Sequence, residues 1–434
     1  MKEPKQQSEK IKASDKIKTS DGGLDALMEF EEQLGDDSTA FKRSKKELNI
    51  IEMPSPLFND LCVIGGLPRG RIVQFFGPFG GGKTFLAMLA AKAALEADPN
   101  CIVIWFDAET SFNYEWAEIL GIWFSSLCTK NPITGKLIDK NRLRVYSIND
   151  GKDIFRRISG EKSVNGFGKE TKKPGLLDMI QAGTLKCPLI VLDSIAAIIP
   201  AGEDTSAIGK QNMALLPRFL PTEFRRLTVP LAKADVCLLC INQVTTNIGD
   251  TWGDKFTFSG GEKLKHWLSL NIFIDKIGSK EAKILTEKGN AETSIGQEIK
   301  FVVKKSKYGP YPRSCSSRIC FKTGIEHTGK IYDQIGVVDK EYEWIELAKH
   351  YEVITGGGAW LNFNEDKYNG AEKLAEAIRA DETILDKIKA KIMAVKNAGV
   401  INNMHIEDED QIMASLEDFE KQYEDNEEDS KEGE

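Results

Sequence analysis

Residues 71–84, with the sequence RIVQFFGPFGGGKT, constrain the fold of this chain more than any other segment. A short apolar run leads into a glycine-rich bend and then an alanine- and leucine-rich stretch, which predicts a strand, a loop and a helix. Gly77, Gly82, Lys83 and Thr84 have the spacing G-x-x-x-x-G-K-[ST] of a phosphate-binding P-loop. A chance glycine-rich turn would also satisfy so loose a pattern, but the flanking strand and helix are the context that a P-loop requires.

The chemistry of such a loop rests on its backbone. Glycines let backbone N–H groups converge on an anion with no side chain in the way, and the start of the helix adds partial positive charge. We expect Lys83 to reach the β- and γ-phosphates of a nucleoside triphosphate and the Thr84 hydroxyl to bind Mg²⁺. The predicted triphosphate-binding residues are Gly77, Pro78, Phe79, Gly80, Gly81, Gly82, Lys83 and Thr84.

The composition argues against several other classes of protein. The apolar runs are too short to span a membrane, and the charged first residues contain no apolar signal sequence. The four histidines lie far apart, which disfavours a histidine-based metal site. Cys237 and Cys240 lie in an apolar run and are expected to be buried thiols rather than a redox pair or a zinc site. Reduced thiols and the lack of an export signal predict a cytoplasmic protein.

The net charge of −8 is unevenly distributed. The last residues, 407–434, carry fourteen acidic side chains against Lys421 and Lys431, a net charge of −12 that leaves +4 for the rest. A mildly basic body with an acidic tail is one form that nucleic-acid-binding proteins take. A disordered tail that only keeps the protein soluble is the alternative reading.

The chain divides into four predicted segments. Residues 1–48 form an N-terminal arm, in which residues 24–34 have the periodicity of an amphipathic helix that must pack on this chain or on a neighbouring copy. Residues 49–324 alternate apolar strands with helices, the pattern of an α/β fold with a mostly parallel central sheet. Residues 325–405 predict a small C-terminal α/β domain, and residues 406–434 an acidic disordered tail.

Polar residues follow three of the predicted strands, at the edge where open α/β sheets bind ligands. Asp193 follows the apolar run LIVL, as an acid that helps to hold Mg²⁺ does, although such an acid is often only a helix cap. Glu109 follows another strand and is suited to polarise an attacking water, or is simply a surface carboxylate. Asn242 and Gln243 end the third strand.

Two long segments lack regular periodicity. Residues 200–212 are polar, and residues 244–262, VTTNIGDTWGDKFTFSGGE, combine four glycines with Trp252, Phe256 and Phe258. Loops of this length in a compact domain are usually functional or disordered. Aromatic side chains between glycines and lysines suit stacking with single-stranded nucleic acid, although they could equally fold into the core.

From residue 51 to 397, the order of these motifs resembles the RecA family of DNA strand-exchange recombinases. GLPRGRIVQFFGPFGGGKT is similar to the first strand and P-loop of the family, WFDAET to its catalytic glutamate segment, and LIVLDSIAAIIP to its magnesium-binding strand. IGKQNMALLPRFLPTEFRRL and CINQVTTNIG are similar to the regions of its two DNA-binding loops. HTGKIYDQIG and GGGAWLNFNEDKYNGAEKLAEAI resemble its C-terminal domain.

The resemblance implies a role for each matching residue. Lys83, Glu109 and Gln243 would be catalytic, with Gln243 sensing the γ-phosphate, while Thr84 and Asp193 hold Mg²⁺. Trp116 would lie against the adenine of ATP, and Lys305 and Lys307 would reach the ATP of a neighbouring subunit. The DNA-side positions implied are Met213, Arg218, Arg225, Trp252, Gly260, Gly261 and Lys265. The expected function is ATP-dependent pairing and exchange between single-stranded DNA in a helical filament and a homologous duplex.

Several departures from the family pattern point to a divergent member, of the bacteriophage (UvsX-like) branch. The loop interior from Phe79 to Gly82 is less polar than in bacterial members, Asn113 replaces an acid, and residues 130–140 form an insertion. A RecA-like hexameric helicase and a non-catalytic recombination mediator are the alternatives. Lys305 and Lys307 argue against the first, and the intact Lys83 and Glu109 against the second.

Overall fold

The computed structural model describes residues 48–132, 134–164, 170–200, 215–246, 256–279, 282–288, 291–325, 331–332, 335–337, 339–356 and 359–397. Nearly all of the predicted N-terminal arm and the whole acidic tail lie outside these residues, as do Met213 and Trp252. The described residues from Asn49 onward belong to one compact unit.

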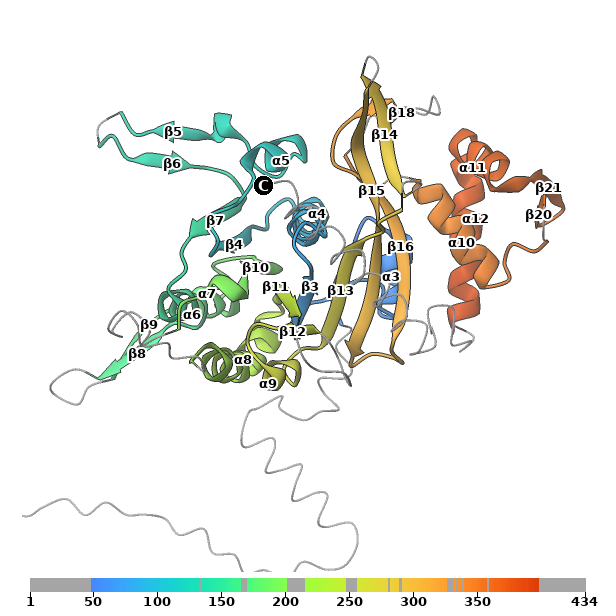
Figure 1. The fold of residues 1–434 in the computed structure, drawn as a ribbon. Helices are drawn as coiled ribbons and strands as arrows, with labels where there is room; N and C mark the ends of the chain where they lie inside the picture. The colour runs from blue at the N-terminus through green and yellow to red at the C-terminus, as the bar shows by residue number, and fades with distance from the viewer. Residues whose placement is uncertain are drawn as a thin grey trace, which may run out of the picture. The chain divides into compact units, whose positions relative to one another are not determined.

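A sheet of eleven strands forms the centre of this unit (Figure 1). Six of its strands are parallel and lie in the order β13, β3, β11, β10, β4, β7. They span Leu270–Lys276, Ile72–Gly77, Cys237–Thr246, Leu189–Asp193, Val103–Asp107 and Leu143–Ser147, respectively. The prediction of a mostly parallel α/β core is confirmed, and Cys237 and Cys240 are buried thiols on β11, as expected.

The sheet continues beyond β13 as an antiparallel extension. Its strands are β15 (Ala291–Ser306), β16 (Arg313–Cys320) and β19 (Gly336–Val337), and β14 (Lys283–Lys288) pairs with β15. A short strand, β12 (Phe256–Phe258), pairs antiparallel with the end of β11, so that the two strands are joined through residues 247–255.

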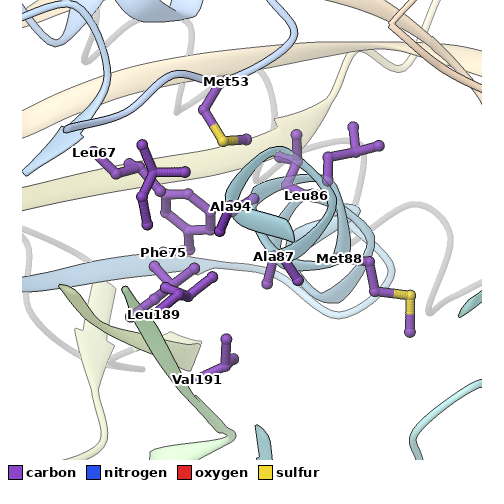
Figure 2. Close-up of a cluster of buried hydrophobic side chains, with 14 of the residues drawn as sticks. Met53, Leu67, Phe75, Leu86, Ala87, Met88, Ala94, Leu189 and Val191 are labelled. Atoms are coloured by element: carbon purple, nitrogen blue, oxygen red, sulfur yellow. The ribbon is translucent and has the colours of Figure 1, made fainter. Parts of the chain in front are cut away.

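Helices cover both faces of the parallel strands, which explains why β10, and β3 apart from Gln74, are apolar on both sides. Helix α4 (Lys83–Ala97) lies on one face, where Phe75 of β3 and Val191 of β10 face Ala87 and Ala94 (Figure 2). Ile72 and Phe76, which point to the other face, join a second core. That core includes residues of α6 (Gly151–Ser159), α7 (Leu176–Gln181) and α8 (Leu215–Ala234).

Several short elements complete the core. These are α3 (Pro56–Leu61), α5 (Tyr114–Ile119), α9 (Glu262–Lys265), the 3₁₀ turns η1 (Ser125–Leu127) and η2 (Ile195–Ala197), and the pair β1 (Ile50–Ile51) and β2 (Leu67–Pro68). The insertion at residues 130–140 is part of a hairpin, β5 (Cys128–Lys130) and β6 (Leu137–Asp139). A second hairpin, β8 (Glu161–Val164) and β9 (Glu170–Lys173), was not predicted. Both hairpins extend from the β7 side of the sheet (Figure 1).

The C-terminal residues gather at the opposite side, beyond β16 (Figure 1). They form α10 (Lys340–His350), the hairpin β20 (Trp360–Phe363) and β21 (Asp366–Asn369), α11 (Gly370–Ala380) and α12 (Glu382–Asn397), while β17 (Gly324–Ile325) and β18 (Ile331–Tyr332) precede them. Residues 370–397 form two helices rather than one. Asp381 ends α11, because its backbone angles are extended and its carboxylate accepts a hydrogen bond from the Thr383 N–H at the start of α12.

A buried polar contact attaches this C-terminal part to the core. The Glu343 carboxylate accepts hydrogen bonds from the Ser55 hydroxyl at 2.7 Å and the Leu57 N–H at 3.2 Å, and also from the Ser317 hydroxyl. The C-terminal part has its own apolar core, which includes Ile345. Among the residues described here, no helix is long and apolar enough to cross a membrane.

Candidate nucleotide and nucleic-acid site

The predicted P-loop follows the central strand β3 and leads directly into α4. Gly77 lies so close to β13 that a Cβ atom there would come within 2.1 Å of the Ile274 carbonyl oxygen. Gly82 is the N-cap of α4 with φ of +89°, a left-handed conformation that a glycine adopts without strain. Phe79, at the crest of the loop, is 80% exposed. Two of the glycines in the motif are therefore required by the backbone itself.

Lys83, the first residue of α4, is buried inside the loop. Its ammonium group donates hydrogen bonds to the Gly77 carbonyl oxygen at 2.9 Å and to the Pro78 carbonyl oxygen. Burial lowers the pKa of Lys83 to about 8, and the carboxylates of Asp193, Asp275 and Glu109 oppose that fall. The lysine is thus a buried cation that the loop carbonyls and three acids surround.

The two predicted magnesium ligands lie next to each other. Asp193 ends β10, and its carboxyl group is hydrogen-bonded to Thr84 on the first turn of α4. Burial, with a smaller contribution from the nearby Glu109 carboxylate, raises the pKa of Asp193 to about 7. Asp107 ends the neighbouring strand β4 in register with Asp193, but its carboxylate accepts the backbone N–H groups of Ser111 and Phe112.

These residues suit a magnesium ion that arrives with a nucleotide. In the described part of the chain, no three His, Cys, Asp or Glu side chains form a metal site by themselves. Mg²⁺ is commonly held by only one or two protein oxygens, with phosphate oxygens and water completing its shell. The Thr84 hydroxyl and the Asp193 carboxylate provide such a pair of oxygens.

The predicted water-activating carboxylate is held from two strands. The Gln243 side-chain amide donates to Glu109 Oε1 at 3.0 Å, and the Ser194 hydroxyl donates to the same oxygen. Glu109 follows β4, Ser194 follows β10, and Gln243 lies on β11. Residues from three neighbouring strands, β4, β10 and β11, therefore meet at one carboxylate oxygen.

Two acidic or polar members of this site were missed from the sequence. Ser194 was seen only as the neighbour of Asp193. Asp275, buried on β13 beside the P-loop, has a pKa that burial raises to about 7 and that the Lys83 ammonium lowers. The signal for Asp275 was available, because it follows the apolar run IFI as Asp193 follows LIVL.

Trp116 lies on α5, over the helix that the P-loop begins. Its ring packs edge-on against Phe85, the residue after Thr84, with 5.5 Å between centroids. It also stacks on Phe321 at 6.4 Å. Asn113 caps α5 by accepting the Trp116 N–H at 2.8 Å, so this departure from the family pattern has a local structural role.

The described residues predicted to face DNA gather around α8 and α9. Arg218 and Arg225 are exposed on α8, seven residues apart and so on one side of the helix. A Cβ atom at Gly260 would lie 3.1 Å from Leu220, and one at Gly261 would lie 3.2 Å from Pro217. The remaining DNA-side residue, Lys265, ends α9 and pairs with Glu262 at 2.8 Å.

Lys305 and Lys307 lie two strands away from β3, Lys305 level with Gln74 and Lys307 toward the start of that strand. Lys305 is the register partner of Asn271, and the Lys307 N–H donates to the Ser269 carbonyl oxygen, beside the start of β3. Burial lowers the pKa of both lysines. The Lys307 ammonium lowers the pKa of Lys305 further, and the Arg71 guanidinium does the same for Lys307. The Lys305 ammonium donates to the Lys265 carbonyl oxygen.

A glycine loop between a central strand and a helix, with acids at the ends of neighbouring parallel strands, defines this chain as a P-loop nucleotide-binding protein. The profile of the RecA N-terminal domain matches residues 24–140 and 176–326, more than half of the chain. The chain therefore belongs to the RecA family.

Similar proteins come from several bacteria. Protein RecA of Chlamydia felis is 28% identical over 333 residues, which cover 76% of this chain and 79% of that protein. Protein RecA of Thermus thermophilus is 27% identical over 350 residues, or 80% and 86% of the two chains. Protein RecA of Chloroherpeton thalassium is 27% identical over 361 residues, or 83% of each chain. These identities agree with the prediction of a divergent member, while its assignment to the bacteriophage branch stays a prediction.

Proposed function

We propose that this protein is an ATP-dependent recombinase that forms a helical filament on single-stranded DNA and pairs that strand with homologous double-stranded DNA. The observation that carries the proposal is the hydrogen bond from Gln243 to Glu109. It joins the carboxylate suited to activate water to the strand that leads into residues 247–255, the predicted DNA-binding segment. A nucleotide-dependent change at Glu109 therefore has a direct structural route to DNA.

Residues Gly77–Thr84 bind the triphosphate through backbone N–H groups and the Lys83 ammonium. Thr84 and Asp193 hold Mg²⁺, which supplies charge neutralisation at the β- and γ-phosphates when bound. Trp116 packs against the adenine, as the resemblance implies. Binding of the triphosphate draws the Lys83 ammonium from the loop carbonyls toward phosphate oxygens, because anionic oxygens are stronger acceptors than peptide carbonyls.

Glu109 orients and polarises the attacking water, and Ser194 and Gln243 fix the position of its carboxylate. A γ-phosphate near Glu109 offers the Gln243 amide a second acceptor. Gln243 can therefore exchange its bond to Glu109 for a bond to the nucleotide. That exchange is the event by which β11 registers whether ATP is bound.

Lys305 and Lys307 act on the nucleotide of a neighbouring subunit. Lys307 lies beside the start of β3 and Lys305 is level with Gln74, whereas the P-loop follows the end of this strand, about 10 to 17 Å further along it. Within one subunit the lysines thus lie back along the strand direction from the loop. ATP between subunits makes nucleotide occupancy a condition for a heterologous contact, the type of contact that generates an open helical filament.

Single-stranded DNA binds along the surface that carries Arg218, Arg225 and Lys265. Cationic groups contact the phosphates, and Trp252 stacks with or spaces the bases. Met213, Gly260 and Gly261 complete this set. The two glycines allow residues 259–261 to pack closely on α8.

The remaining segments have supporting roles in this proposal. Residues 1–48 pack on the adjacent subunit as an arm, residues 49–324 are the ATPase core, and residues 325–405 are a small C-terminal domain. The acidic residues 406–434 compete with DNA for the basic surface. A cytoplasmic location belongs to the same proposal.

The decisive experiment is to measure the ATP hydrolysis rate with and without single-stranded DNA, using Lys83→Ala as the inactive control. We expect DNA to stimulate the wild type, and electron microscopy with a non-hydrolysable ATP analogue to reveal filaments on DNA. Closed rings would instead identify a hexameric helicase. Neither rings nor filaments, together with no DNA stimulation, would identify a non-catalytic mediator and refute the proposal.

A further inference from the structure

Three amide side chains are buried side by side in the middle of the sheet. Asn271 on β13, Gln74 on β3 and Asn242 on β11 occupy three adjacent strands, with exposures of 2%, 0% and 0%. A buried amide costs free energy unless its donors and acceptors are bonded. Three of them on neighbouring central strands therefore call for a physical explanation.

The amides form one continuous chain of hydrogen bonds. The Gln74 amide nitrogen donates to Asn271 Oδ1 at 3.0 Å, and the Asn242 amide nitrogen donates to Gln74 Oε1 at 3.3 Å. The same Asn242 nitrogen donates to the Ser259 carbonyl oxygen at 2.9 Å, and Asn242 Oδ1 accepts the Gln243 N–H. We refer to Asn271, Gln74 and Asn242 as the amide chain.

One end of the amide chain lies at the base of the predicted DNA-binding segments. Ser259 directly follows β12, and the next two residues, Gly260 and Gly261, pack on Leu220 and Pro217 of α8. Helix α8 begins at Leu215, so the residues that follow each of the two segments, 201–214 and 247–255, pack against one another here. At the other end, Gln74 lies on β3 three residues before Gly77.

Two neighbouring residues of β11, Asn242 and Gln243, contact different parts of the molecule. The Gln243 side chain reaches Glu109, and the Asn242 side chain reaches Gln74 and Ser259. Successive side chains of a strand point to opposite faces. A movement of β11 that follows the nucleotide through Gln243 is therefore delivered to Ser259 through Asn242.

Stability alone does not require this arrangement. Replacing bonded partners with apolar groups of similar shape is often close to neutral, whereas a polar chain with every member bonded fixes one geometry. We infer that Gln74 and Asn242 are positioning residues that hold Ser259 at a fixed place relative to the P-loop strand. They thereby couple nucleotide binding to DNA affinity. The inference rests on the proposed function.

The test measures the dissociation constant for single-stranded DNA with and without a non-hydrolysable ATP analogue. The dissociation constant without the analogue divided by that with the analogue is the coupling factor, which lies between about 5 and 150 in typical allosteric proteins. Gln74→Met and Asn242→Leu, which nearly keep the side-chain volume, should each lower this ratio by about 2- to 30-fold. Affinity for the analogue without DNA should stay within about twofold, because every P-loop residue is intact.

Ile272→Val is the matched control, since it removes a buried methyl group from β13 next to Asn271 but leaves the amide chain intact. Its coupling factor should equal that of the wild type. Wild-type coupling in folded Gln74→Met and Asn242→Leu proteins would overturn the inference while leaving the proposed function standing. If the DNA affinity of the wild type is the same with and without the analogue, both the inference and the proposed function are overturned.

Hydrogen exchange of the wild-type chain provides a measurement that needs no substitution. Binding of the analogue without DNA should slow exchange of the backbone amides of residues 259–261, because the amide chain then holds them more tightly. Exchange that is the same with and without the analogue would overturn the inference, even if neither variant folds.

Discussion

Replacing Asp193 by Asn should make the protein more stable at pH 8 while removing its activity. Asp193 is 3% exposed, and its pKa rises from 3.8 to about 7, with burial as the largest cause. At 1.36 kcal/mol per pKa unit, holding the ionised form in the folded state costs about 4 kcal/mol. Asn keeps the shape, and the pKa of about 7 already includes the attraction to Lys83, so we expect a net gain of up to about 4 kcal/mol.

The pH dependence of this gain has a defined sign. Below pH 4 the carboxyl group is protonated in both the folded and unfolded states, so the substitution changes little. As the pH rises from 4 to 7, the unfolded state ionises first and the wild type loses stability. Above pH 7 both states are ionised and the difference between Asn and Asp is complete.

Urea-induced unfolding without nucleotide, at pH 5 and pH 8, provides the measurement. The midpoint of Asp193→Asn should exceed that of the wild type by much more at pH 8 than at pH 5. Asp386→Asn, at an exposed position of α12, serves as the control and should change the unfolding free energy by less than about 0.5 kcal/mol at either pH. An Asp193→Asn protein that is destabilised equally at both pH values would refute the reasoning, because burial of the charge would then not be the dominant effect.

Three further predictions concern the proposed chemistry. Glu109→Gln should lower kcat for ATP hydrolysis by about 10²- to 10⁴-fold and leave nucleotide affinity nearly unchanged, as measured by steady-state kinetics and nucleotide titration; an unaltered kcat would remove Glu109 from the mechanism. Lys83→Ala and the double variant Lys305→Ala/Lys307→Ala should each be inactive alone. In an equal mixture, about a quarter of the subunit contacts should combine an intact P-loop with intact lysines, and these contacts should regain activity. No recovery in mixed ATPase assays would count against lysines acting across subunits. Deleting residues 407–434 should raise the association rate with single-stranded DNA by about tenfold or more and weaken its inhibition by salt, in stopped-flow measurements; identical rates would show that the tail does not compete with DNA.

The parts of the site that could be predicted from the sequence are those encoded locally. The P-loop, Glu109 and Asp193 each follow an apolar run directly, and parallel strands bring such ends to one edge of a sheet. Asp275 carries a similar local signal, but its strand also contains Asn271 and continues to Lys276, so the sequence marks its end less clearly. The two lysines at 305 and 307 were identified only by resemblance. Their place relative to the P-loop strand depends on the register of β13 and β15, which no local pattern specifies.

The amide chain could not be predicted, because it depends on strand order. Asn271 and Gln74 are 197 residues apart in sequence, and Gln74 and Asn242 are 168 apart. Each polar residue interrupts an apolar strand and, on its own, argues only for a weaker strand. The three side chains come within hydrogen-bonding distance only because β13, β3 and β11 are neighbours in the sheet. The β8–β9 hairpin was missed for a simpler reason, since GEKSVNGFGKETKK is polar and lacks the apolar alternation that predicts strands.

Strand β11 is the element at which the two halves of the proposed function meet. Its partner on one side is β3, which leads into the P-loop, and on the other β10, which ends in Asp193. Its last described residues pair with β12 and so frame residues 247–255. A strand packed between the two nucleotide-binding strands has little freedom to move alone, because interiors are close-packed and shift between discrete arrangements. A nucleotide that repositions Gln243 must therefore move the Asn242 side chain with it. If the proposed function is right, occupancy of the P-loop and the affinity for DNA should therefore change together, in one step.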